Sequence, residues 1–203
     1  MALAIYASCV VAMMAISGTY HLLNVGGTAR AVVQHVDYFA IWFLIGGTFT
    51  AIHGVMCRGL WRRGLLTLIW TLAATGIVLQ ALWFRTFSGV PGLALYLGCG
   101  WVGLASIVKL SRLIGFRAVR PMLYGGLFFT VGAVLEALNR PVLIPNWIGP
   151  HEIFHFAVIV GVAIHWHFIR RLLLFHRAVA SVDAPTPSLN QGALRLDGAR
   201  TNV

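Results

Sequence analysis

The chain has 203 residues, of which 59% are hydrophobic and only 10% are charged, and its formal net charge is +10. Soluble domains carry about 25% charged residues and cannot bury so much apolar surface, so the composition excludes an ordinary soluble protein and indicates a bilayer environment. The positive charge does not indicate a nucleic-acid partner, because the basic residues lie in short segments between apolar runs rather than in one patch.

Six apolar runs are each long enough to cross a hydrocarbon core about 30 Å thick as a helix. Long apolar runs without strand alternation favour helices over a membrane barrel. The sequence therefore predicts an all-α, polytopic membrane helix bundle over residues 1–178, integral to the cell (plasma or inner) membrane, with no room for a second soluble domain. The predicted helices are 1–23, 37–56, 64–84, 91–109, 122–138 and 150–175.

The two ends of the chain differ in character. The segment MALAIYASCVVAMMAIS has an apolar core without a preceding basic region, so we interpret it as part of a retained span rather than a cleaved signal peptide. Residues 179–203 are polar and include Pro185 and Pro187, which is typical of a disordered tail.

Basic residues are unevenly divided between the two sets of predicted loops. Twelve lie in or beside the loops after 56 and 109 and in the C-terminal region, against three on the other side. Because short cytoplasmic loops are enriched in Lys and Arg, this bias predicts that both termini are cytoplasmic. The twelve are Arg58, Arg62, Arg63, Lys109, Arg112, Arg117, Arg120, Arg170, Arg171, Arg177, Arg195 and Arg200, and the three are Arg30, Arg85 and Arg140.

Ionisable side chains within membrane spans are costly and therefore mark candidate functional sites. Ser17 and His21 lie four residues apart near the end of the first predicted helix, and Asp37 begins the second. His151 and His155 lie four apart at the start of the sixth. Residues four apart share one helix face, so the last two can bind one metal ion together. The predicted topology puts all five residues at the same membrane depth.

Three neutral imidazoles from two helices suit tetrahedral zinc with water in the fourth position. We therefore expect His21, His151 and His155 to bind zinc, with Asp37 orienting the water or a ligand and Ser17 supporting the water or a substrate carbonyl. Zinc lowers the pKa of bound water to about 7, which favours hydrolysis of a lipid amide or ester. Histidines near span ends are also compatible with ordinary interfacial hydrogen bonding, and the residues alone leave both interpretations open.

Residues 151–155 also spell HExxH, the zinc-protease pattern in which the glutamate acts as general base. An intramembrane protease is therefore an alternative hypothesis. Such proteases take a third ligand from an aspartate in a later span, whereas the Leu-Asp-Gly sequence around Asp197 lies in the polar tail. Glu152 is turned by about 100° from His151 on an ideal helix, so an interfacial role without chemistry is an equal alternative for it.

The other polar residues in or near the spans are weaker candidates. His165 lies fourteen residues after His151, about 21 Å along a helix axis, and cannot share its metal, so we expect a core or interfacial role. Glu136 is expected to pair with Arg140 or to serve a proton or ion path. No chemistry is assigned to His35, His53, His167 and His176, nor to Cys9, Cys57 and Cys99, which form no CxxC pair and indicate neither a thiolate metal site nor a disulfide framework.

The chain contains, in this order, the segments SGTYH, HVDYFAIWFLIGGTFT, GGLFFTVGAVLEALNRP and GPHEIFHFAVIVGVAIHWHF. Together they resemble the hemolysin III proteins and, more distantly, the adiponectin and progestin receptors of the same superfamily, over most of residues 6–175. The resemblance implies a helical bundle with one zinc ion, for which the matching ligands are the same three histidines. It also implies that Asp37 lies near the zinc-bound water, that Ser17 is the serine of an SxxxH motif, and that the activity is a ceramidase-like amide hydrolysis.

The sequence departs from this family in two respects. Family members have seven spans and their SxxxH motif closes the second, whereas here it closes the first of six. The usual opening span is therefore absent from this sequence, either because the start is misassigned or because the protein has six spans. The receptors keep the metal toward the cytoplasm, whereas the arginine distribution here predicts a site that faces outward.

Three functional hypotheses follow for an integral membrane protein whose partner is membrane lipid. The first is a zinc-dependent hydrolase of the hemolysin III type that acts on a lipid amide or ester. The second is a non-enzymatic protein, receptor-like or lytic, with structural zinc. The third is the HExxH intramembrane protease. A bis-histidine haem bundle is disfavoured because no further histidine pair is placed for it, and the sequence does not define the oligomeric state.

Overall fold

The computed structural model describes residues 1–145 and 147–182. Within them, six helical segments are long and apolar enough to cross a membrane, which confirms the predicted all-α polytopic bundle. Of the polar tail predicted at 179–203, the first four residues belong to the last helix, and 183–203 lie outside the described residues. The helices are α1 (Ala2–Leu22), α2 (Thr28–Met56), α3 (Gly59–Leu82), α4 (Phe84–Phe87), α5 (Val90–Trp101), α6 (Gly103–Ile114), α7 (Phe116–Ala137) and α8 (Pro150–Val182).

Several helices continue beyond the apolar cores from which they were predicted. α2 begins nine residues before 37, α7 begins six residues before 122, and α8 ends seven residues after 175. The added turns carry residues such as Arg30 and Arg117, because a helix keeps its backbone hydrogen-bonded while long basic side chains reach the interface. The helix predicted at 91–109 consists of α5 and α6, which meet at Val102 within one apolar segment, Val90–Ile114.

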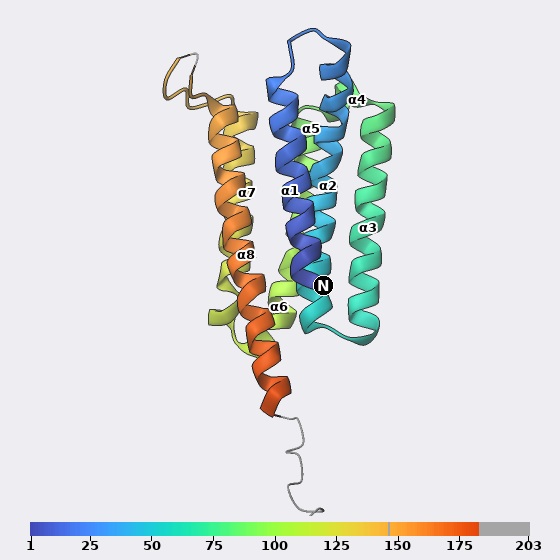
Figure 1. The fold of residues 1–203 in the computed structure, drawn as a ribbon, viewed down its shortest axis with the longest axis vertical. Helices are drawn as coiled ribbons and strands as arrows, with labels where there is room; N and C mark the ends of the chain where they lie inside the picture. Colours follow the sequence, from blue (N-terminus) through green and yellow to red (C-terminus); the bar gives the residue numbers. More distant parts are fainter. Residues whose placement is uncertain (146, 183–203) are drawn as a thin grey trace, which may run out of the picture.

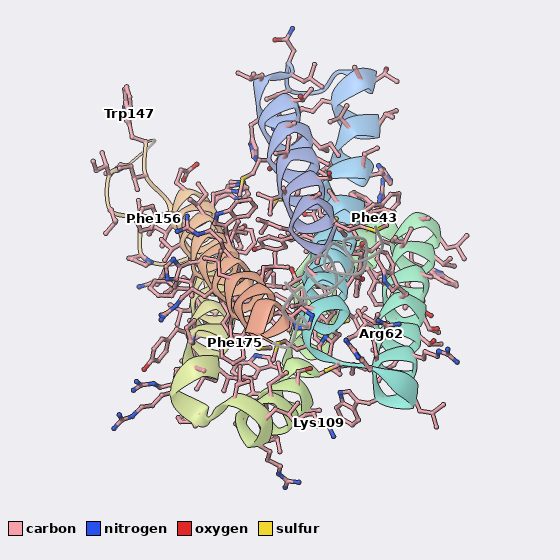
Figure 2. The ribbon with its side chains drawn as sticks, turned by 60° about the horizontal axis from the view of Figure 1, so that its bottom comes forward. Phe43, Arg62, Lys109, Trp147, Phe156 and Phe175 are labelled. Carbon is pink, nitrogen blue, oxygen red and sulfur yellow. The ribbon has the colours of Figure 1, made fainter. Side chains whose placement is uncertain are left out.

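The long helices stand side by side, with α7 and α8 on one side of the bundle and α3 on the other (Figure 1). The loops α1–α2, α3–α4 and α7–α8 lie at one end, which we call the site end. The N-terminus and the last turns of α8 lie at the opposite end, the arginine-rich end (Figure 1). Figure 2 brings that opposite end forward, with Arg62 and Lys109 at its edge. The chain therefore returns to the end at which it began.

α1 and α8 are connected within the membrane by a buried tyrosine. Tyr6 is fully buried, and its hydroxyl group donates a hydrogen bond to the Val162 carbonyl oxygen at 3.0 Å. The Tyr6 ring also stacks on Trp166, with ring centroids 6.3 Å apart. Because no water satisfies polar groups in hydrocarbon, this hydrogen bond fixes the register of α1 against α8.

A second buried polar group joins α2, α3 and α5. Gln80 of α3 is fully buried; its side-chain oxygen accepts a hydrogen bond from Trp42 Nε1 at 2.9 Å, and its amide nitrogen lies 2.7 Å from the Tyr96 hydroxyl oxygen. The Trp42 ring lies against Gly76 of α3, where a Cβ atom would be 2.0 Å from Trp42 Cζ2. Only glycine therefore allows the ring to reach Gln80.

We predict that Gly76→Ala destabilises the bundle by about 1–3 kcal/mol, because the added methyl group must displace the Trp42 ring from a packed core. Thermal unfolding of the purified protein in detergent, followed by circular dichroism, measures the effect. Gly64→Ala is the matched control, since it lies on the same helix with open space around its Cβ position. Equal unfolding midpoints for the two variants contradict the proposed packing role.

Candidate metal centre

Three histidines meet at the site end of the bundle. His21 lies in the last turn of α1, and His151 and His155 lie in the first turns of α8, where their spacing of four puts both on one face. His151 Nε2 lies 3.1 Å from His21 Nε2 and 3.0 Å from His155 Nε2. One ring nitrogen from each residue lies within 4.8 Å of the other two. The structure thus brings together the three residues that the sequence analysis selected as metal ligands.

The spacing of these nitrogen atoms suits a small divalent cation. Zn–N bonds of about 2.0–2.1 Å in a tetrahedral arrangement separate two ligand nitrogens by about 3.3 Å, close to the contacts seen here. A neutral imidazole also has one lone pair to offer, and a cation is the partner that can accept three of them at once. His21 is exposed while the other two rings are half-buried, so one side of the cluster is open. The three side chains can therefore hold one metal ion and leave a coordination position free.

Glu136, near the end of α7, holds one of the three rings in place. Its Oε1 atom lies 3.1 Å from Nδ1 of His151. Because a carboxylate only accepts hydrogen bonds, Nδ1 must carry the proton, which leaves the Nε2 lone pair facing the other two histidines. Carboxylates commonly orient metal-binding histidines in this way. The sequence analysis expected Glu136 to pair with Arg140, whereas in the structure it pairs with His151 of the adjacent helix α8.

Ser17 and Asp37 form a second polar pair beside the cluster. Ser17 is buried on α1, one turn before His21, and lies near the half-buried carboxyl group of Asp37 on α2. Both residues border the same cavity as the three histidines. Among the described residues, Asp37 is not part of the group whose ligand atoms converge. It can accept a hydrogen bond from a molecule beside the metal position without binding the metal itself.

A cavity of about 750 Å³ extends from this site into the bundle. Side chains of α1, α2, α5, α6, α7 and α8 line it, and most of them are apolar, such as Ile45 and Phe129. His165 also borders the cavity; it is buried, and its Nε2 atom lies 3.2 Å from the Met122 carbonyl oxygen. The expected core role of His165 is confirmed. A volume of this size matches those of small-molecule binding sites in proteins.

Glu152 does not face the histidine cluster. Its side chain is exposed and absent from the cavity lining, and its Oε2 atom accepts a hydrogen bond from the Gly149 backbone N–H at 2.8 Å. This contact caps the first turn of α8. A zinc protease needs its HExxH glutamate beside the metal, so the geometry disfavours the protease hypothesis. The Leu-Asp-Gly sequence around Asp197 lies outside the described residues.

Comparison with known proteins relates the chain to one protein family. A family described as Haemolysin-III related matches residues 1–166, a range that includes all the residues of the site. Hemolysin-3 of Bacillus cereus is 30% identical over 166 residues, which are 77% of this chain and 73% of that protein. The Hemolysin-3 homolog of Bacillus subtilis (strain 168) is 26% identical over 134 residues, which are 66% of this chain and 60% of that protein. No solved structure matches the chain.

We predict that Glu136→Ala weakens metal binding by about 10- to 100-fold, because the His151 ring loses the partner that fixes its tautomer and orientation. Competition with a chromophoric chelator measures the affinity of the purified protein. Glu152→Gln is the control, since its amide oxygen can still accept the hydrogen bond from the Gly149 N–H and keep the first turn of α8 in place, and its affinity should fall much less than that of Glu136→Ala. A wild-type affinity for Glu136→Ala contradicts the assigned role.

Proposed function

Because the chain belongs to the Haemolysin-III related family, as its motifs predicted, we propose that it is a zinc-dependent hydrolase of the cell (plasma or inner) membrane that cleaves an amide or ester bond of a membrane lipid. The observation that carries the proposal is the position of three convergent imidazoles at one end of a large, mostly apolar cavity. In this proposal both termini are cytoplasmic and the metal centre faces outward.

Zinc is the metal that the donor set favours. Three neutral nitrogen ligands with a fourth position open are typical of catalytic zinc sites, and the hydrogen bond from His151 to Glu136 is the usual companion of such a ligand. Zinc bound there would activate water near neutral pH and polarise a carbonyl group. The exposed side of the cluster at His21 leaves room for the water molecule and for the carbonyl group.

Asp37 and Ser17 supply the proton-handling groups in this proposal. The Ser17 hydroxyl would donate a hydrogen bond to the nearby Asp37 carboxylate, which keeps further lone pairs for the site. Asp37 would accept the proton of the attacking water and deliver it to the leaving group. Ser17 is one turn from His21, which keeps this pair beside the metal position.

The cavity supports a lipid as the substrate. Its apolar lining suits acyl chains, and the polar residues Ser17 and Asp37 border it at the end that holds the histidines. A lipid bound in this way would have its chains in the bundle and its amide or ester carbonyl at the site. Water would be excluded from most of the cavity by the same apolar side chains.

A non-enzymatic function with structural zinc is the second candidate. The histidine cluster connects α1 with α8, and a metal ion there would join the first and last described spans. The matched relatives carry the name hemolysin, and lysis of membranes would need such an assembled bundle rather than catalysis. Stability and activity measurements on the same variants distinguish the two candidates.

We predict that the double variant His151→Ala, His155→Ala loses stoichiometric zinc, because one imidazole cannot hold the ion alone. Metal analysis of the purified protein provides the test. His167→Ala, an exposed histidine on the same helix, is the matched control and should retain zinc. Zinc that persists in the double variant would rule out the site.

We predict that Asp37→Asn keeps its zinc but lowers the rate of lipid amide cleavage by about 100-fold or more, because the asparagine cannot take up a proton. Turnover of a fluorescent ceramide in mixed micelles, with and without a chelator, measures the activity. A zinc-loaded wild-type protein without turnover of ceramide or ester lipids, which lyses vesicles equally well with Asp37→Asn, supports the structural-zinc candidate instead.

A further inference from the structure

The loop between α7 and α8 presents apolar side chains on its surface. It is described over residues 138–145 and 147–149, at the site end of the bundle. Leu143 is 62% exposed and Trp147 is 81% exposed, the latter among the most exposed large apolar side chains of the described residues. Their neighbours Val142, Ile144 and Ile148 are also exposed. A loop in water would present polar side chains instead.

The backbone of this loop is hydrogen-bonded within itself. The N–H groups of Leu143 and Ile144 donate to the Ile148 carbonyl oxygen at 2.9 and 3.1 Å, and the Ile148 N–H donates to the Ile144 carbonyl oxygen at 2.9 Å. The Trp147 N–H group also donates to Ile144, at 3.1 Å. Peptide groups that enter an apolar medium must be paired internally, because no water is available there. In the described part of the loop, the N–H groups of Leu143, Ile144, Trp147 and Ile148 are paired in this way.

The loop projects away from the other helices. Figure 1 shows it beyond the ends of α7 and α8, displaced to the side opposite α3. Figure 2 shows the Trp147 side chain pointing outward at the edge of the molecule. Because α7 and α8 are spans, the segment that joins their ends lies at the level of the membrane boundary. Its exposed apolar side chains are therefore at a level where they can reach the lipids around these two helices.

Arg140 adds a positive charge at the base of the loop. It is exposed. Among residues 1–145 and 147–182, Glu136 pairs with His151, and Arg140 takes no part in an ion pair. Arg30, at the same end, differs: its guanidinium group donates to the carbonyl oxygens of Tyr20 and Leu23 and lies over the Tyr20 ring. Of these two arginines, Arg140 is therefore the one whose guanidinium group is available to lipid phosphate groups.

We propose that the α7–α8 loop is a membrane-interface anchor, in which Trp147 and the aliphatic side chains enter the boundary between headgroups and acyl chains while Arg140 contacts lipid phosphate. Tryptophan and arginine are the residues that helical membrane proteins use at this depth. The occupant of the apolar loop surface is the bilayer itself. The loop leads directly into α8, so its insertion sets the depth of the first turn that carries His151. This anchoring role is independent of the proposed hydrolase function.

The experiment compares the wild-type chain with Trp147→Phe in phosphatidylcholine vesicles brominated at acyl positions 6,7 or 11,12. The fluorescence lost in Trp147→Phe is that of Trp147. We expect bromine at positions 6,7 to quench this fluorescence at least twofold more than bromine at 11,12. Aqueous acrylamide should quench it only slightly. Trp70→Phe is the depth control, because Trp70 lies near the middle of α3 and should show the opposite order. The substitution at the highly exposed Trp147 leaves the core untouched.

Two results would overturn the anchor. Quenching of Trp147 by acrylamide but not by brominated lipid means that the loop lies in water. Protection from both quenchers means that another protein surface, such as a second copy of this chain, covers the loop. Equal circular dichroism spectra of the wild type and Trp147→Phe establish that the difference in fluorescence reports the loop and not a change of fold.

Discussion

Inside a bilayer no water satisfies a polar group, and this constraint decides where the polar side chains of the bundle lie. Tyr6 and Gln80 are fully buried, and each forms a hydrogen bond to another helix. His165 is paired with a backbone carbonyl oxygen. Ser17, Asp37 and Glu136 border the cavity that also holds the histidine cluster, where an ion or a substrate can interact with them. His53 and Ser106 are buried elsewhere in the bundle. The same rule therefore accounts both for the contacts that hold the helices together and for the place of the site.

The contact between α1 and α8 shows how stability and function share residues. In one half of the bundle, Tyr6 donates its hydrogen bond to Val162. In the other half, His21 meets His151 and His155. The cavity extends from the second contact into the bundle. A metal ion bound by the histidines would thus join these two helices. It would also border the cavity in which a lipid can bind.

The spans were predictable because hydropathy and the thickness of the bilayer determine them, and the three histidines were predictable because helical spacing and common depth are visible in a sequence. Helix ends were predicted less well, since the turns around Arg30 and Arg117 are polar and still helical. Glu136 was missed as a partner of the site because its contact with His151 depends on how α7 packs against α8. The capping role of Glu152 was also missed, although a glutamate three residues after the residue that begins a helix is a known capping pattern.

The order of the metal-site residues along the chain has a consequence for biogenesis. His21 leaves the ribosome with the first helix, whereas His151 and His155 follow about 130 residues later with the last one. At translation speeds of about 5–20 residues per second, the first imidazole waits several seconds in the membrane before its partners arrive. Binding of a metal ion by all three histidines would therefore have to wait until α8 has inserted and packed. A metal ion bound there would report that α1 and α8 have come together.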